Sequence, residues 1–190
     1  SMLANDFVNI LFVGRIAPNK KIEDVIRLAE HYKRYVDFQY RFIFVGRHDA
    51  VPRYYDAIRG LIAQYRMLTE RFWFTGPVPD EDLAAFYRWA DVYISLSEHE
   101  GFCVPLIEAM AADVPVLAYA AGAVPETLGG AGVLFAPKDL EVAAEMLGML
   151  VYDRPVRARI LEGQRTRLKD FAPERIEAQL TAALSALRIR

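Results

Sequence analysis

Two short stretches of the chain carry charged residues of the kinds and spacing that bind a phosphorylated ligand. The first, GRIAPNKK at residues 14–21, follows the first apolar run of the chain. Pro18 and Asn19 favour a tight turn, and Arg15 and Lys20 flank it. Two cations at the carboxyl end of a strand suit an anionic group such as a diphosphate. A solvated basic loop is the alternative interpretation, because charged side chains are common on protein surfaces.

The second stretch, residues 97–110, also follows an apolar run. Pro105 suits the first turn of a helix, so Gly101–Val104 would form the loop that enters the helix. Free N–H groups and the helix dipole make such a loop an anion site, and its glycine allows close approach of a ligand. The carboxylates of Glu100 and Glu108 flank this loop and are good acceptors for sugar hydroxyls. For Glu108, the alternative is a first-turn carboxylate stabilised by the helix dipole.

Other kinds of site have little support in the sequence. No Gly-x-Gly-x-x-Gly or Gly-x-x-x-x-Gly-Lys-Ser/Thr pattern occurs, which disfavours ordinary dinucleotide-binding and P-loop proteins. His31, His48 and His99 have no partner at metal-ligand spacing, so we expect no metal site. Cys103 is expected to be a packing cysteine rather than a nucleophile.

The composition is that of a folded globular chain. Its 190 residues are 54% hydrophobic and 25% charged, which allows one domain with a substantial core. The net charge of −2 argues against a nucleic-acid-binding protein, so we expect no nucleic-acid partner. A single cysteine excludes a disulfide within the chain and fits a cytoplasmic location.

The termini and the membrane-related signals give further expectations. No signal peptide is visible, and no apolar run reaches the roughly 18 residues of a membrane span. The opening Ser1 and Met2 are typical of residues left by cloning, so we expect the native sequence to begin inside a longer protein.

Short apolar runs alternate with helical patterns along the chain. The predicted strands are 7–13, 42–45, 72–75, 92–96, 115–119 and 132–135, and the predicted helices are a segment around 25–29, then 52–67, 80–89, 140–151, 154–169 and 173–188. This alternation predicts an α/β fold: a Rossmann-like, doubly wound parallel sheet of about six strands with helices on both faces. In such sheets the ligand lies beyond the carboxyl ends of the strands, where both charged stretches fall. Asp80 is expected to cap its helix.

These charged stretches, and other short segments of the chain, resemble the motifs of a known family. Phe12–Lys20 resembles the signature that opens the C-terminal domain of group 1 (family 4) glycosyltransferases, and Glu100–Glu108 resembles their E-x7-E motif. Further matching segments are 74–76, 91–95, 108–112, 115–116 and 122–126. Together they cover nearly the whole chain in the family's order.

The resemblance implies one half of a GT-B fold, in which two Rossmann-like domains hold the substrates between them. The whole chain, 1–190, would be the C-terminal, donor-binding half, with the helices from about 154 packing toward the missing N-terminal domain. The implied nucleotide-binding residues are Gly14, Arg15, Lys20, Arg47, Val78, Glu100, Gly101, Phe102, Cys103, Val104 and Glu108, of which Glu100, Arg15 and Lys20 are assigned to catalysis. By resemblance, Arg15 and Lys20 contact the diphosphate, Glu100 faces the transferred sugar, and Glu108 binds the ribose.

The implied reaction is transfer of a hexose from a UDP- or GDP-sugar, with retention at the anomeric carbon and without metal or cofactor. An absent N-terminal domain would bind the acceptor, so the isolated domain is expected to be inactive alone. The whole enzyme would serve glycan biosynthesis in the cytoplasm, with peripheral membrane contact through the missing half. The alternatives are an epimerase-like enzyme acting on nucleotide sugars and a non-enzymatic nucleotide-binding module.

Three residues depart from the family pattern. Cys103 and Asp113 stand where glycine is usual, and Asp113 is expected at a helix end, where aspartate tolerates left-handed geometry. Lys21 also replaces a common glycine, so either Lys20 or Lys21 could reach the phosphate. We favour Lys20.

Overall fold

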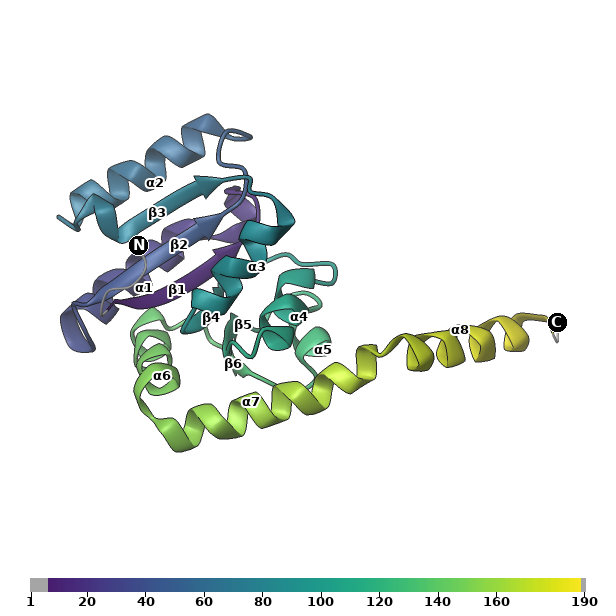
Figure 1. The fold of residues 1–190 in the computed structure, drawn as a ribbon. Coiled ribbons are helices and arrows are strands. Elements are labelled where there is room, and N and C mark those ends of the chain that lie inside the picture. Colours follow the sequence, from purple (N-terminus) through teal and green to yellow (C-terminus); the bar gives the residue numbers. More distant parts are fainter. Residues whose placement is uncertain (1–6, 189–190) are drawn as a thin grey trace.

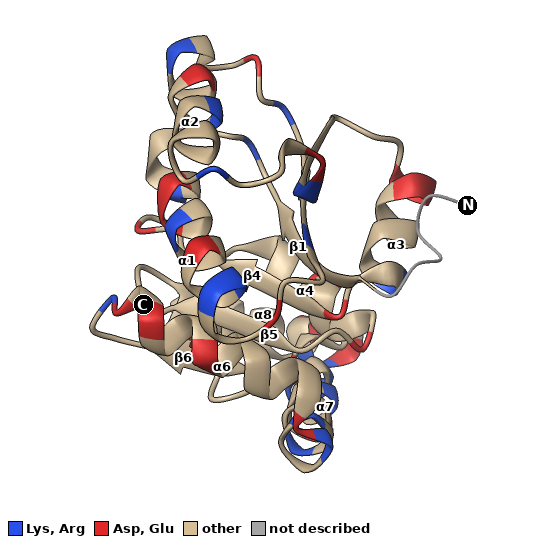
Figure 2. Cartoon of the chain, turned by 90° about the vertical axis from the view of Figure 1, so that its left-hand side faces the viewer, with Lys and Arg blue, Asp and Glu red and all other residues tan. Residues whose placement is uncertain are grey.

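The computed structural model describes residues 7–188, which form an α/β body from which the last helix projects (Figure 1). Ser1 and Met2, interpreted above as cloning residues, lie outside the described part of the chain. None of the described helices is both long enough and apolar enough to span a bilayer. Acidic and basic residues are interspersed over the elements seen in Figure 2, in keeping with the net charge of −2.

One parallel sheet of six strands forms the centre of the fold, as predicted. Its strands are β1 (Val8–Val13), β2 (Tyr40–Val45), β3 (Phe72–Gly76), β4 (Val92–Ser95), β5 (Val116–Tyr119) and β6 (Val133–Phe135). Their order is β3-β2-β1-β4-β5-β6, with parallel pairing throughout. The order reverses between β1 and β4, and the crevice beyond their carboxyl ends is where doubly wound sheets bind ligands.

Helices cover both faces of the sheet. The helices of the described chain are α1 (Ile22–Tyr35), α2 (Pro52–Gln64), α3 (Asp80–Trp89), α4 (Val104–Ala111), α5 (Val124–Leu128), α6 (Leu140–Tyr152), α7 (Arg154–Leu168) and α8 (Pro173–Arg188), of which α8 projects away from the sheet. Residues of α1, α2 and α6 belong to one buried apolar cluster, and residues of α3, α4 and α5 belong to the other. Because both faces are covered, β1, β2 and β4 are apolar and buried along most of their length instead of alternating.

One local expectation is wrong, and one short helix was not predicted. Asp80 does not cap α3: Pro79 occupies the cap position, and no side chain caps this helix end. Asp80 lies in the first turn instead, where an acidic residue still complements the helix dipole. Helix α5, which no predicted element covers, has only five residues and is too short for a helical hydrophobic period to show.

Helices α7 and α8 behave differently from each other. Gln164 of α7 is fully buried: its Oε1 accepts from the Val116 backbone N–H at 2.9 Å, and its Nε2 donates to the Val114 carbonyl at 2.8 Å. Helix α7 is therefore held to the strand β5 region of this domain, while packing of the helices from about 154 toward a missing N-terminal domain stays a prediction. In Figure 1, α8 runs outward beyond the body. Its apolar side chains are exposed: Ile176, Leu180, Leu184 and Leu187.

Candidate functional site

The loops that follow β1 and β4 meet at the switch point of the sheet. The β1 loop contains a short 3₁₀ turn, Pro18–Lys20, which matches the tight turn expected there. Its Asn19 carbonyl accepts from the Ser97 hydroxyl at 3.0 Å and from the Glu98 backbone N–H at 3.1 Å. The two charged stretches identified in the sequence therefore form one site.

An ion pair joins the two loops. Lys20 Nζ lies 2.6 Å from Glu100 Oε1, and the two side chains are only 18% and 8% exposed. Lys21 points to a different partner, Glu98, at 3.1 Å. Lys21 also adopts the left-handed conformation at φ 54°, which accounts for the glycine usual at this position. Of the two lysines, Lys20 is the one in direct contact with a predicted site residue.

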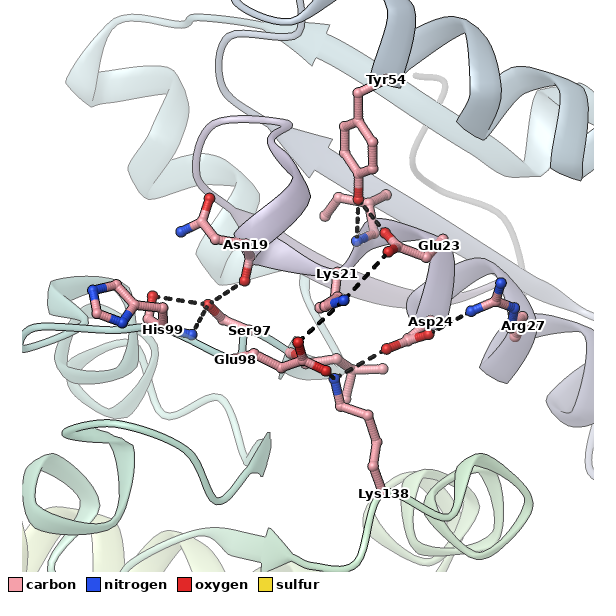
Figure 3. A network of polar contacts seen from close by, with 12 residues as sticks. Asn19, Lys21, Glu23, Asp24, Arg27, Tyr54, Ser97, Glu98, His99 and Lys138 are labelled. Carbon is pink, nitrogen blue, oxygen red and sulfur yellow. Dashed lines mark hydrogen bonds and ion pairs between the residues drawn. The ribbon is translucent and has the colours of Figure 1, made fainter.

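A polar network anchors the β4 loop from the side of β6 (Figure 3). Lys138 Nζ donates to the Leu96 carbonyl at 3.0 Å, to Glu98 Oε1 at 2.9 Å and to Asp24 Oδ2 at 3.0 Å. Hydrogen bonds from Lys138 and Lys21 lower the pKa of the Glu98 carboxyl. Three segments distant in sequence are thus joined through the ammonium group of Lys138, a residue that no motif in the sequence marked.

Helix α5 holds the same loop from the opposite side. The Ala123 backbone N–H donates to the Glu100 carbonyl at 3.1 Å, and the Thr127 hydroxyl donates to the Phe102 carbonyl at 2.6 Å. Gly122 has a φ of +55°, and a Cβ at this position would lie 2.7 Å from the Glu100 carbonyl oxygen. Only glycine therefore allows this close approach, which fixes the backbone of Glu100.

The N-terminus of α4 opens onto this loop. No side chain caps the helix, whose cap residue Cys103 is left-handed at φ 60°. A Cβ added to Gly101 would meet nothing within 4 Å, and the side chains of Phe102 and Val104 are half exposed. Cys103 is buried in the apolar cluster with α3 and α4, as expected of a packing cysteine, and this burial raises the pKa of its thiol to about 12, which disfavours a thiolate nucleophile.

Glu108 lies in α4 and is held by a neutral partner. It is the fifth residue of the helix, so its alternative interpretation as a first-turn carboxylate is wrong. Its Oε2 accepts from the buried hydroxyl of Tyr87 in α3 at 2.7 Å. Both residues line a surface hollow of about 590 Å³ between the two helices. The only sequence signal for Tyr87 was a tyrosine at a buried position of a predicted helix.

Other predicted site residues lie at the strand ends without joining the ion pair. Arg15 is exposed and forms no hydrogen bond or ion pair with the described residues. The exposed Arg47 side chain turns to Asp49 at 3.1 Å, although its carbonyl accepts from a β1-loop N–H. Val78 is partly buried against the core beneath α3. Gly14 follows β1, and a Cβ at Gly46 would lie 2.3 Å from its carbonyl oxygen, so the glycine at position 46 is what permits this close contact after β1 and β2.

No group of three or more histidine, cysteine, aspartate or glutamate side chains among residues 7–188 is arranged to hold a metal ion.

Asp113 adopts the left-handed conformation at φ 57°, next to the end of α4, as expected. Its carboxylate also pairs with Arg165 of α7 at 2.7 Å.

These features define a class of protein: a Rossmann-like α/β domain with a candidate ligand site at the switch point of a doubly wound sheet. The comparison with known families makes this specific. The chain belongs to the family described as Glycosyl transferases group 1, whose sequence model matches residues 3–167.

Curated relatives include bacterial enzymes that transfer sugars. The chain is 30% identical over 146 residues to O-antigen chain mannosyltransferase B of Escherichia coli, covering 75% of this chain and 37% of that protein. It is 28% identical over 179 residues to D-inositol 3-phosphate glycosyltransferase of Corynebacterium efficiens, covering 93% of this chain and 42% of that protein. The chain therefore spans less than half the length of these relatives.

Solved structures show the same relation. Anabaena HepE in complex with UDP and glucose superposes with a TM-score of 0.83 at 25% identity, covering 97% of this chain and 50% of that one. The C-terminal domain of a group 1 family glycosyl transferase, LpcC from Francisella tularensis, gives a TM-score of 0.72 at 26% identity, covering 87% and 85%. The chain thus matches half of one protein and most of an isolated C-terminal domain.

Proposed function

We propose that this chain is the donor-binding domain of a retaining glycosyltransferase that transfers a hexose from a UDP- or GDP-sugar. The observation that carries the proposal is the Lys20–Glu100 pair, 2.6 Å apart at the switch point of the sheet. It places a cation for a diphosphate beside a carboxylate for sugar hydroxyls, next to the uncapped N-terminus of α4.

The proposed chemistry is electrostatic. Breaking the bond between sugar and diphosphate leaves negative charge on the diphosphate, which Lys20, Arg15 and the α4 N-terminus are placed to stabilise. This arrangement needs no metal ion and no protein nucleophile, in keeping with transfer on the front face of the sugar. Because Lys20 is already paired with Glu100, the donor must displace this contact as it binds.

Glu108 is assigned to the ribose of the donor, and the base is assigned to the loops after β2 and β3, near Arg47 and Val78. The HepE complex with UDP and glucose supports a uridine donor. The E. coli relative named as a mannosyltransferase leaves the choice of sugar open. Both UDP- and GDP-sugars therefore stay in the proposal.

The rest of the enzyme is also part of the proposal. An N-terminal domain would bind the acceptor, and the exposed apolar side chains of α8 support packing of this helix against it. The complete enzyme would act in the cytoplasm in glycan biosynthesis, with peripheral membrane contact through that other half. No nucleic acid takes part.

Titration calorimetry of this chain with UDP, GDP and their sugars tests the proposal. We expect one nucleotide series to bind, and Glu108→Gln to weaken that binding about tenfold through loss of a charged hydrogen bond. Glu141→Gln, which changes an exposed carboxylate in the first turn of α6, is the matched control and should bind normally.

The measurement also separates the alternatives. If no nucleoside diphosphate binds, or if Glu108→Gln binds like the wild type, this chain is not a donor domain of the proposed kind. An epimerase-like enzyme would convert the sugar of the bound nucleotide, whereas a non-enzymatic module would bind nucleotide with no reaction even when joined to its complete protein.

A further inference from the structure

The two carboxylates of the candidate site differ in what holds them, and the partner of Glu108 has no assigned role. Tyr87 projects from α3 toward α4 and is only 4% exposed. Its hydroxyl lies 2.7 Å from Glu108 Oε2 and 3.4 Å from the Pro105 carbonyl oxygen. With a single proton to donate, the hydroxyl gives it to the nearer and charged acceptor, Glu108.

We infer that Tyr87 is a positioning residue that aims the Glu108 carboxylate at the ribose of a bound nucleotide. The inference rests on the proposed function, which assigns the ribose to Glu108. Tyr87 does not touch the nucleotide in this scheme. It fixes one carboxylate oxygen, and the other, Oε1, accepts no hydrogen bond from residues 7–188 and is free for the ligand.

The surroundings of Tyr87 make it a rigid support. Its ring packs in the buried cluster beneath α3 and α4, with the Tyr93 ring 6.3 Å away. Burial is the main cause that raises the pKa of Tyr87, so the hydroxyl stays protonated and remains a donor at physiological pH. A buried, protonated donor on one helix therefore restricts a carboxylate on the next, at the edge of the hollow that both line.

Without the Tyr87 hydroxyl, the Glu108 side chain would sample several rotamers. The ribose would then bind only those protein molecules in which the carboxylate has the right rotamer, so its affinity would fall. The loss is larger for a ribonucleotide than for its 2′-deoxy analogue, because the deoxyribose offers one hydroxyl fewer to the aimed carboxylate. A purely structural role for the hydroxyl would instead weaken all nucleotides alike. The ratio of affinities for ribo- and 2′-deoxyribonucleotides therefore reports positioning.

The test compares UDP with 2′-deoxy-UDP, and GDP with 2′-deoxy-GDP, by titration calorimetry on the whole chain. We expect Tyr87→Phe to weaken the bound ribonucleotide about fivefold and its deoxy analogue less than about twofold. Tyr152→Phe is the matched control, because it deletes a hydroxyl that donates to the Asp37 carboxylate and lies outside the site. It should leave both affinities unchanged.

An unchanged ribo-to-deoxy ratio in Tyr87→Phe overturns the positioning role, whether both affinities fall together or neither changes. If the wild type binds no nucleotide, the proposed function has failed and the inference falls with it, which calorimetry distinguishes directly. If Tyr87→Phe does not fold, NMR of the wild-type protein provides the test instead. A slowly exchanging Tyr87 hydroxyl proton in both the free and the UDP- or GDP-bound protein supports the role, and rapid exchange in either state overturns it.

Discussion

The carboxylates of Glu100 and Glu108, at two places in the candidate site, have different kinds of hydrogen-bond partner. Glu100 is bound to a cation, Lys20 Nζ, whereas Glu108 is bound to a neutral hydroxyl, that of Tyr87. The charges of Glu100 and Lys20 neutralise each other, so a ligand of the proposed kind would have to replace each of them as the partner of the other. The Tyr87 hydroxyl orients the Glu108 carboxylate but leaves its negative charge in place. In the proposed site, the same residue type would therefore exchange its partner for the ligand at position 100 and bind the ligand directly at position 108.

Lys20→Ala should have the largest effect on this contrast. We expect nucleoside diphosphate affinity to fall about tenfold to a hundredfold, because a charged hydrogen bond to phosphate is lost and Glu100 is left unpaired beside the anion. Calorimetry with UDP and GDP measures the effect. Lys21→Ala is the control: it loses contacts with Glu98 and Glu23 only, so an equal loss there would reverse the assignment of the two lysines.

Gly101→Ala should come next and act on binding alone. A methyl group at this position meets nothing within 4 Å of the protein, so we expect an unchanged melting temperature. It would occupy the space of a ligand close to the backbone and weaken UDP or GDP about fivefold or more. Gly122→Ala makes the opposite comparison, since its Cβ would lie 2.7 Å from the Glu100 carbonyl oxygen and should lower the melting temperature. Normal nucleotide binding by Gly101→Ala would place the phosphate elsewhere.

Glu100→Gln should change the affinity for UDP or GDP less than the two substitutions above. It should strengthen nucleotide binding, whereas Glu108→Gln should weaken it. Removing the charge frees Lys20 and removes repulsion of the diphosphate, worth about 1 kcal/mol at this range. We therefore expect UDP or GDP to bind about fivefold tighter, with the gain reduced at high salt. Transfer by the complete enzyme should nevertheless fall, because the sugar hydroxyls lose a charged acceptor and keep only a weaker, neutral amide oxygen. Weaker nucleotide binding by Glu100→Gln would show that the pair does not oppose the diphosphate.

The Cys103 thiol should show the smallest effect, on reactivity rather than affinity. Its pKa of about 12 keeps it protonated at pH 8, so alkylation by iodoacetamide should be much slower in the folded chain than in urea. The same shift links to stability: the folded-state pKa exceeds the unfolded value of about 8.5, so this contribution is complete below pH 8.5 and is lost as pH rises toward 12. Rapid alkylation of the folded protein would contradict both statements.

The sequence predicted the parts of the site that local chemistry specifies. The turn at Pro18–Lys20 follows from proline and asparagine, and the entry to α4 follows from Gly101 and Pro105. The six strands followed from continuous apolar runs, because burial on both faces leaves no alternation.

The sequence could not predict the residues whose roles depend on packing between distant segments. Lys138 joins residues 42 and 114 positions away, and Tyr87 reaches a carboxylate 21 positions away. In the sequence each looks like an ordinary surface lysine or core tyrosine. For Arg47 the resemblance implied a nucleotide-binding residue, but in the structure its side chain pairs with the neighbouring Asp49.

The Lys20–Glu100 pair also bears on which small molecules the proposed site would reject. A ligand that brings only negative charge, such as inorganic phosphate, must separate the pair and leave a carboxylate that is 8% exposed without a donor. A nucleotide sugar brings phosphate oxygens for the lysine and hydroxyl protons for the glutamate together. The proposed site would then favour ligands that carry both chemical groups, so that abundant cellular anions carrying only one of them compete poorly.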